Sequence, residues 1–393
     1  MQDPLPLLVS WLREDARRPP QGYRQGYRFE EISAQEWQAL LAAADAHRVS
    51  PLLYARLRAD GVLDRLPAEV ELALERAYVV SRTRHALRWQ ALEHALSALA
   101  AQGIEVILLK GAALIATLYD EPALRPMDDL DILVSPAQFR AAVACLCERG
   151  YRPDHAEPFQ GANEMISHHL ALTGTVPVKH ALELHHALLD LPAALGAAIP
   201  VPELLERAEA LTVGAAPARV LCLPDQLLHL AAHLALQNPA DERLIWYCDL
   251  DRLVRREADR LPWDEVLARA ERYRMTLALQ RVLHRLVALL DTPVPAEVLA
   301  QAAALPVDPA QRLRYGSAPS RSRSRLVDGL QKMAGAGSQG AGLRMAWRLL
   351  FPDRAYMRAT YGDNGPLRLI ASYPARWAAV LREATTRNPH RGR

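Results

Sequence analysis

Two aspartates in the segment MDDLDILV carry the clearest chemical signal in the chain. Asp129 and Asp131 alternate with the apolar residues Leu130 and Ile132, which is the period of a β-strand with one buried face. Alternate side chains of a strand share a face, so both carboxylates would be held a short distance apart on a rigid element. Such a pair suits one or two Mg²⁺ ions, which prefer oxygen ligands, with Mn²⁺ as the alternative ion. Asp128 has the opposite parity and is interpreted as a loop or capping residue.

A metal site of this kind normally needs a third carboxylate. The best candidate is Glu183 in ALELHH, because an acid in an apolar strand is costly to bury unless it is paired or binds a cation. If this segment is a strand, Lys179 and His185 share the face of Glu183; if it is a helix, Glu183 is an ordinary exposed residue. His185 and His186 are interpreted as packing or hydrogen-bonding residues, or as partners of a metal ligand.

The pair Lys110 and Gly111 follows the apolar run IEVILL, where a strand gives way to a helix. A glycine there lets the backbone approach a ligand, the helix N-terminus offers free N–H groups, and the lysine supplies a positive charge. Arginine is used almost everywhere else, since lysine occurs only at positions 110, 179 and 332. The pair therefore predicts a triphosphate cradle, although the spacing of a P-loop is absent.

Two further patterns resemble metal sites but favour other interpretations. His229 and His233 have the spacing of a zinc-binding helix, yet Leu230 stands where the catalytic glutamate of such a helix is required. A role in helix packing or substrate contact is favoured for both histidines. Asp249 and Asp251 repeat the D-x-D spacing in a helical segment, where residues two apart do not face each other.

The elements that must position these residues follow from the hydrophobic period. The order is a strand in IEVILL, a helix in AALIATLY, a strand in LDILV, a helix from Ser135 as N-cap with Pro136 as first helical residue to about Gly150, and a third strand around Glu183. The predicted organisation is a helical N-terminal region (1–101), a core with the acids (102–200), a helical domain (201–310), a flexible linker (311–345) and a C-terminal segment with a disordered end (346–393).

Length and composition limit the classes of protein that need be considered. The chain has 393 residues, half of them apolar, and Lys and Arg exceed Asp and Glu by two. It can bury a sizeable core, and its charge gives no general reason to bind a membrane surface or a long nucleic acid. The first residues lack the pattern of a secretory signal, and the apolar stretches are too short to span a bilayer, so a cytoplasmic protein is expected.

Five motifs, taken in order, resemble a known family. ILLKGAAL, LRPMDDLDILV, LELHHAL, LPDQLLHLAAH and LFPDRAYMRATYG are similar to the bacterial uncharacterised nucleotidyltransferase family. This family belongs to the DNA-polymerase-β-like superfamily and is related to toxin-type nucleotidyltransferases. The similarity extends from about Glu36 to Tyr361.

The resemblance implies roles for particular residues. Asp129 and Asp131 match the metal-binding acid pair and Glu183 the third acid. Lys110 and Gly111 stand where many superfamily members carry Gly-Ser, which changes the expected contact with phosphate. Arg125 precedes the acid pair within the family's motif, and a phosphate-binding or acid-orienting role is implied for it.

The expected fold is α+β, with a small mixed sheet flanked by helices. The expected reaction is Mg²⁺-dependent transfer of a nucleoside monophosphate from an NTP to a hydroxyl or phosphate of an acceptor, with release of pyrophosphate. The acceptor stays open among a peptide or other natural product, a protein, a tRNA and a small molecule. Two alternatives are a non-catalytic nucleotide-binding or scaffold protein, which the complete acid set argues against, and a metal-dependent phosphohydrolase that uses the histidines.

Overall fold

The computed structural model describes residues 3–13, 29–154, 167–189, 199–237, 243–307, 309, 311–312, 347, 350–362 and 371–378. Of the predicted linker (311–345), only residues 311–312 are described, and the rest lies outside the described residues. The predicted disordered end at 387–393 also lies outside them. Both therefore stay predictions.

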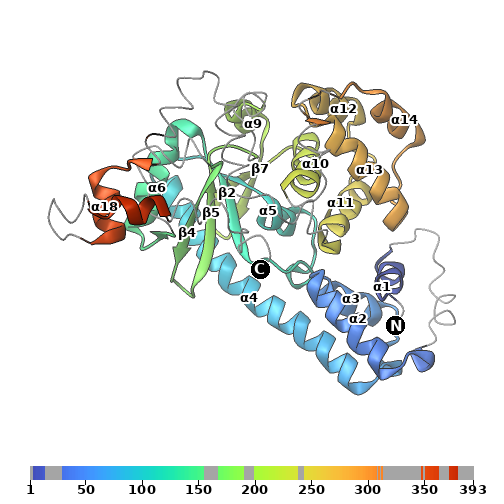
Figure 1. Ribbon diagram of the computed structural model, residues 1–393. Helices are drawn as coiled ribbons and strands as arrows, with labels where there is room; N and C mark the ends of the chain where they lie inside the picture. The colour runs from blue at the N-terminus through green and yellow to red at the C-terminus, as the bar shows by residue number, and fades with distance from the viewer. Residues whose placement is uncertain are drawn as a thin grey trace.

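A seven-stranded mixed sheet in the order β3-β4-β5-β2-β1-β7-β6 forms the centre of the fold (Figure 1). β2 runs parallel to β5 and β1 runs parallel to β7, whereas the other neighbouring strands are antiparallel. The strands are β1 (Ile107–Leu108), β2 (Asp129–Leu133), β3 (Arg152–Pro153), β4 (His169–Gly174), β5 (His180–His185), β6 (Glu209–Val213) and β7 (Ala216–Val220). The predicted α+β class is confirmed.

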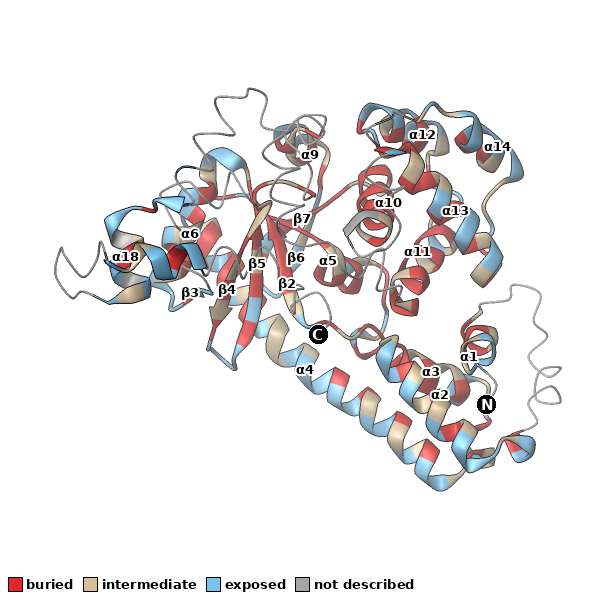
Figure 2. Cartoon of the chain, in the orientation of Figure 1, coloured by how far each residue is buried: buried red, intermediate tan, exposed pale blue. Residues whose placement is uncertain are grey.

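The two faces of the sheet have different surroundings. Leu130 of β2 and Leu182 of β5 belong to a hydrophobic core shared with α4 (Ala68–Ala100) and α6 (Phe139–Glu148). Alternate side chains, including those of Asp131 and Glu183, therefore project from the opposite face, on the side of α5 (Lys110–Thr117). Figure 2 shows that the central strands are buried along most of their length. The apolar period of β2 and β5 thus aims the acids away from this core, as predicted.

Helix α4 joins the N-terminal helices to the sheet. It has 33 residues, which corresponds to about 50 Å, and it runs beneath both regions in Figure 1. Its first half packs on the N-terminal helices through Val70, Leu74 and Tyr78, and its second half packs on the sheet. The N-terminal helices are α1 (Leu5–Leu12), α2 (Ala34–Ala46), which begins with a capping box of Ser33 and Glu36, and α3 (Ser50–Ala59).

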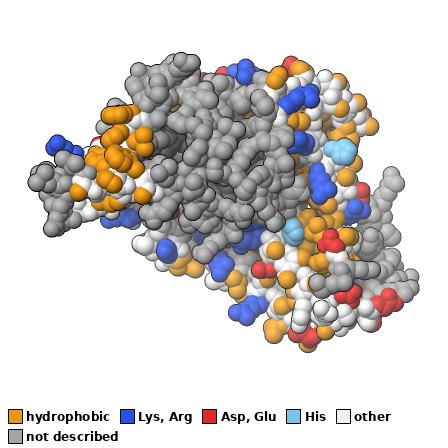
Figure 3. All heavy atoms as spheres, viewed as in Figure 1, with side chains coloured by type: hydrophobic (Ala, Val, Ile, Leu, Met, Phe, Trp, Pro, Cys, Tyr) orange, Lys and Arg blue, Asp and Glu red, His pale blue; other side chains and the backbone are white. Residues whose placement is uncertain are grey.

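A second group of helices begins after β5, with α9 before the β6–β7 hairpin and the others after it, and packs into the same core as the N-terminal helices. It comprises α9 (Val201–Arg207), α10 (Leu223–Ala232), the π-helical turn η6 (His233–Gln237), α11 (Leu244–Arg256), α12 (Trp263–Arg272), α13 (Thr276–Leu290) and α14 (Ala296–Ala304). Nearer the C-terminus, α18 (Arg354–Tyr361) lies beside an exposed apolar surface (Figure 3) that includes Trp347, Phe351 and Trp377. No helix among the described residues has the length and apolar character needed to cross a bilayer.

Several predicted elements differ in detail from those observed. The first strand is confined to Ile107–Leu108, and Pro136 begins a 3₁₀ turn, η5 (Pro136–Gln138), before α6, without a side-chain cap from Ser135. The other 3₁₀ turns among the described residues are η2 (Phe29–Glu31), η3 (Leu63–Arg65) and η4 (Pro122–Leu124).

The sheet also extends past the predicted boundary at residue 200. A hairpin of β6 and β7 turns at Gly214, whose φ of 57° lies in the left-handed region that glycine adopts readily. The hairpin pairs with β1. The stretch 201–310 is therefore not wholly helical.

Candidate functional site

The acid cluster, defined here as Asp129, Asp131 and Glu183, lies on the face of the sheet near α5. Asp131 of β2 stands opposite Glu183 of β5 in the parallel register of the two strands. An oxygen of each of these two carboxylates and a ring nitrogen of His185 lie within 4.8 Å of one another. Lys110 reaches both acids, since its Nζ lies 2.6 Å from Asp131 Oδ1 and 3.5 Å from Glu183 Oε2.

Asp129 lies one pleat before Asp131 on the same face. Burial and the negative charge of Asp131 raise the pKa of Asp129 to about 6, against the opposing charge of Lys110. Burial also opposes ionisation of Asp131, but Lys110 and His185 outweigh it and hold the pKa of Asp131 below its usual value. Crowded carboxylates of this kind are stabilised by a cation, and their oxygens are the donors that Mg²⁺ prefers. The acid cluster therefore fits a divalent cation, with the ammonium of Lys110 already providing positive charge beside two of its members.

Lys110 occupies an uncommon backbone conformation. Its φ is 45°, in the left-handed region that residues with a Cβ rarely adopt. Burial opposes its charge, but Asp131 and Glu183 raise the pKa of Lys110 above its usual value, so it remains an ammonium ion. The strand-to-helix position agrees with the sequence, whereas the side chain pairs with the acids. Its predicted contact with phosphate stays a prediction.

Gly111 has a packing reason that the sequence did not reveal. A Cβ at this position would lie 3.1 Å from Arg125 Nη1 and 3.1 Å from Met127 Cγ. These distances are tighter than most contacts of a Cβ, so a side chain at Gly111 would require Arg125 or Met127 to shift by a few tenths of an ångström. Gly111 thus lets the start of α5 pack closely against Arg125 and Met127. Its predicted role in a close approach of the backbone to a ligand stays a prediction.

Arg125 is held in a buried ion pair. Its Nη2 donates to Asp249 Oδ2 at 2.8 Å and its Nε lies 3.2 Å from both carboxylate oxygens. The hydroxyl of Tyr119 donates to Asp249 Oδ1 at 2.7 Å. Because the guanidinium also lowers the pKa of Asp129 by its charge, the acid-orienting role implied for Arg125 suits this geometry better than a direct contact with phosphate.

The second D-x-D pattern does not form a carboxylate clamp, as predicted. Asp249 pairs with Arg125, whereas Asp251 accepts hydrogen bonds from Arg255 Nε at 2.9 Å and from the hydroxyl of Thr292 at 2.6 Å. The two aspartates of α11 thus stabilise separate contacts within the protein.

An arginine-lined cavity adjoins the acid cluster. It has a volume of about 110 Å³, and its lining includes Arg48, Arg84, Arg88 and Arg125, together with Met127 and Asp128 just before Asp129. Burial and the neighbouring charge of Arg84 lower the pKa of Arg88, while Asp129 opposes this shift. Burial and nearby arginines also lower the pKa of Arg48. Cations that repel one another in a shared cavity favour a bound anion.

Sequence reasoning missed this cavity, although part of its signal was visible. Arg84 and Arg88 are four residues apart on α4, so they lie on one face of that helix. Only the tertiary structure shows that this face meets the segment before β2. Asp128 forms an ion pair with Arg48, which agrees with its interpretation as a loop residue.

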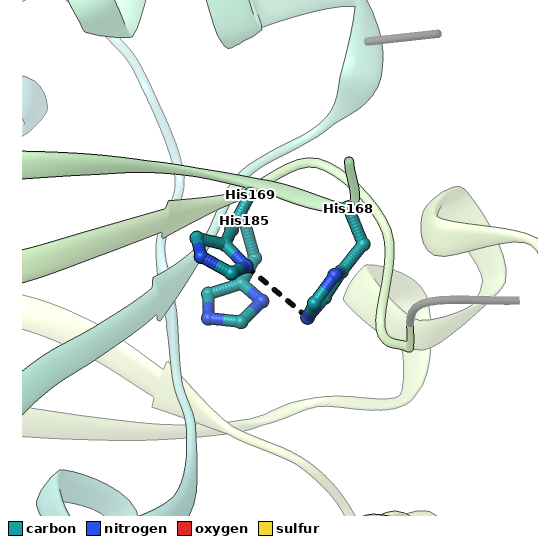
Figure 4. Close-up of side chains that lie close together, drawn as sticks. All are labelled: His168, His169 and His185. Atoms are coloured by element: carbon teal, nitrogen blue, oxygen red, sulfur yellow. Dashed lines mark hydrogen bonds between the residues drawn. The ribbon is translucent and has the colours of Figure 1, made fainter. Parts of the chain in front are cut away.

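Two histidines that sequence reasoning did not consider lie beside the acid cluster. His169, at the start of β4, and His168, just before it, stand next to His185 at the end of β5 (Figure 4). The segments SHHLAL and LELHH gave a partial indication of this cluster, since each places two histidines at the end of a strand. Their proximity depended on the antiparallel register, which the sequence did not specify.

The other residues singled out in the sequence are His186, Lys179, His229 and His233. His186 is hydrogen-bonded to the carbonyl of Ser167 and packs against Phe139, and Lys179 is exposed just before β5. His229 is buried in α10 and His233 is partly buried at the start of η6, with ring centroids 6.5 Å apart. Burial lowers the pKa of His229 to about 3 and holds the pKa of His233 well below its usual value. Both histidines are neutral at ordinary pH, and their predicted role in helix packing or substrate contact stays a prediction.

Comparison with known proteins places these features in a family. Residues 33–291 of the chain match a family model described as an uncharacterised nucleotidyltransferase. A solved structure of an antigenic nucleotidyltransferase-like protein from Paracoccidioides brasiliensis aligns with a TM-score of 0.33 and 13% identity, over 58% of this chain and 94% of that one. No curated protein matches the chain. Because the family match covers more than half of the 393 residues and includes the whole acid cluster, the chain belongs to the uncharacterised nucleotidyltransferase family.

Proposed function

We propose that the protein transfers a nucleoside monophosphate from an NTP to an acceptor, with Mg²⁺ or Mn²⁺ bound by Asp129, Asp131 and Glu183. The observation that carries this proposal is the pairing of Asp131 and Glu183 across adjacent parallel strands, with Asp129 on the same face and an arginine-lined cavity next to it. A divalent cation at these acids would neutralise triphosphate charge and lower the pKa of an acceptor hydroxyl.

The residues of the cavity supply the donor site in this proposal. Arg48, Arg84 and Arg88 bind the β- and γ-phosphates, because guanidinium groups match phosphate oxygens in charge and in hydrogen-bond geometry. The α-phosphate then lies toward Asp129 and Asp131. Arg125 stays paired with Asp249 and holds the segment that begins β2.

The acceptor approaches Glu183, whose side chain is 23% exposed, whereas that of Asp131 is 2% exposed. An acceptor oxygen forms a bond to the α-phosphorus, and the bond from that phosphorus to the oxygen bridging to the β-phosphate breaks. The electron pair leaves with pyrophosphate. The proton of a hydroxyl acceptor, whose pKa a bound cation would lower, passes to solvent. Against the effect of burial, the hydrogen bond from His185 and the charge of Lys110 hold the pKa of Glu183 well below its usual value, so this carboxylate stays charged and available to the cation.

Removal of the cavity arginines should weaken binding of the triphosphate. Replacing Arg84 or Arg88 by alanine should lower the affinity for an NTP with Mg²⁺ by about 10-fold each, since each change removes charge-assisted hydrogen bonds. Affinity is measured by calorimetry. Arg82→Ala, an exposed arginine on the same helix that does not line the cavity, is the matched control. Unchanged NTP affinity in both cavity variants would place the triphosphate elsewhere.

A further inference from the structure

Three imidazoles meet at the edge of the acid cluster. In the antiparallel register of β4 and β5, His169 stands opposite His185, and His168 immediately precedes β4. Figure 4 shows the three rings clustered together beside the ends of the strands. The centroid of the His168 ring lies 4.4 Å from that of His169 and 5.1 Å from that of His185, and the His169 and His185 centroids are 5.1 Å apart.

The spacing of the ring nitrogens suits a small metal ion. His169 Nδ1 lies 3.2 Å from His168 Nε2, and one nitrogen from each of the three rings lies within 4.8 Å of the others. Two nitrogens bound at the usual zinc distance in a tetrahedral site are about 3.3 Å apart. The first pair therefore already has the separation that a shared ion would impose, and a small movement of His185 would complete three ligands.

The Nδ1 atom of His185 has an unusual environment. His185 is fully buried, and its Nδ1 makes no hydrogen bond with any described residue. An unpaired buried nitrogen is costly, and a metal ion between the rings would satisfy it. The other nitrogen of His185, Nε2, lies 3.0 Å from Asp131 Oδ1 and 3.4 Å from Glu183 Oε2.

His169 repeats this arrangement. Its Nδ1 faces His168, while its Nε2 lies 3.6 Å from Glu183 Oε1. In metal sites, a ligating histidine commonly presents its second ring nitrogen to a carboxylate, which fixes the tautomer and the ring orientation. Here two of the three histidines have such a carboxylate.

We propose that His168, His169 and His185 form a site for a divalent transition-metal ion of the Zn²⁺ or Co²⁺ class, distinct from the Mg²⁺ site of the proposed function. Three imidazole nitrogens favour such ions over Mg²⁺, which selects oxygen donors. Asp131 and Glu183 act at this site as positioning residues, because they contact the far nitrogens of His185 and His169.

The test is titration of the metal-stripped full-length protein with Co²⁺, followed by visible absorption, with Zn²⁺ in competition. The wild type should bind one equivalent with the intense spectrum of a four-coordinate site, and excess Mg²⁺ should not displace it. His168→Ala and His169→Ala should each weaken binding by more than about 100-fold, since each removes a ligand. Both side chains are partly exposed, so these variants should fold, which circular dichroism checks.

Two control variants sharpen the outcome. His284→Ala removes an exposed histidine of α13 and should leave Co²⁺ binding unchanged, and Asp129→Asn should also retain it. The proposal would be overturned if the wild type bound neither Co²⁺ nor Zn²⁺, or if the His168 and His169 variants bound them as tightly as the wild type. The contact between His168 and His169 would then be a hydrogen bond alone. Binding that Asp129→Asn abolishes and Mg²⁺ displaces would also overturn it, because the ion would then occupy the acid cluster. NTP is absent from all these measurements, so their result is independent of the proposed transfer reaction.

Discussion

Replacement of Asp249 by alanine should lower the free energy of unfolding by about 3–5 kcal/mol, because it leaves the charge of Arg125 buried without its partner. The side chains of Arg125 and Asp249 are 9% and 1% exposed, so water cannot easily replace the lost carboxylate. The change also removes the acceptor of the Tyr119 hydroxyl. Denaturant unfolding of wild type and variant, followed by circular dichroism, measures the difference.

A surface pair provides the control for this prediction. Arg256 pairs with Asp120, whose side chain is 81% exposed, and Asp120→Ala should change the free energy of unfolding by less than about 0.5 kcal/mol. Replacing both members of the buried pair, as in Arg125→Met/Asp249→Leu, should cost less than Asp249→Ala, because no unpaired charge remains. A loss below about 1 kcal/mol for Asp249→Ala would contradict the assigned burial of Arg125.

The second large effect concerns catalysis. Asp131→Asn should reduce nucleotidyl transfer by at least about 10³-fold, because the amide retains the shape of the side chain but loses the charge that binds the cation. It also loses the ionic contact with Lys110 and weakens the hydrogen bond with His185. The rate is measured as transfer of label from an α-labelled NTP to the acceptors of a cell lysate.

An exposed aspartate serves as the matched control for this loss. Asp64 lies in the 3₁₀ turn η3, away from the sheet, and Asp64→Asn should retain the wild-type rate. A thermal melt shows whether Asp131→Asn is folded at the assay temperature. Transfer by folded Asp131→Asn at the wild-type rate would remove Asp131 from the reaction.

The hydrophobic period predicted the parts of the fold that depend on local sequence. Strict alternation in β2 placed Asp129 and Asp131 on the face opposite Leu130, and the same reasoning placed Glu183 correctly once its segment was taken as a strand. The β6–β7 hairpin was not predicted, because its Ala-rich alternation around Gly214 is weak without the pairing to β1.

Contacts between distant segments account for what the sequence did not reveal about the site. Arg125 and Asp249 are 124 positions apart, so their pairing depends on how α11 packs against the segment before β2. The face of α4 that bears Arg84 and Arg88 depends on the rotation of that helix against the sheet. The meeting of His168 and His169 with His185 depends on a strand register that no local pattern specifies.

The most direct test of the central claim is calorimetric binding of the four NTPs in the presence and absence of Mg²⁺, with wild type and Asp129→Asn/Asp131→Asn. The wild type should bind at least one NTP only when Mg²⁺ is present, because the acids and the triphosphate share the ion. The double variant, folded by its thermal melt, should lose this binding. Metal-dependent NTP binding that persists in the double variant, or no NTP binding by either protein, would contradict the assignment of the acid cluster as a nucleotidyl-transfer site.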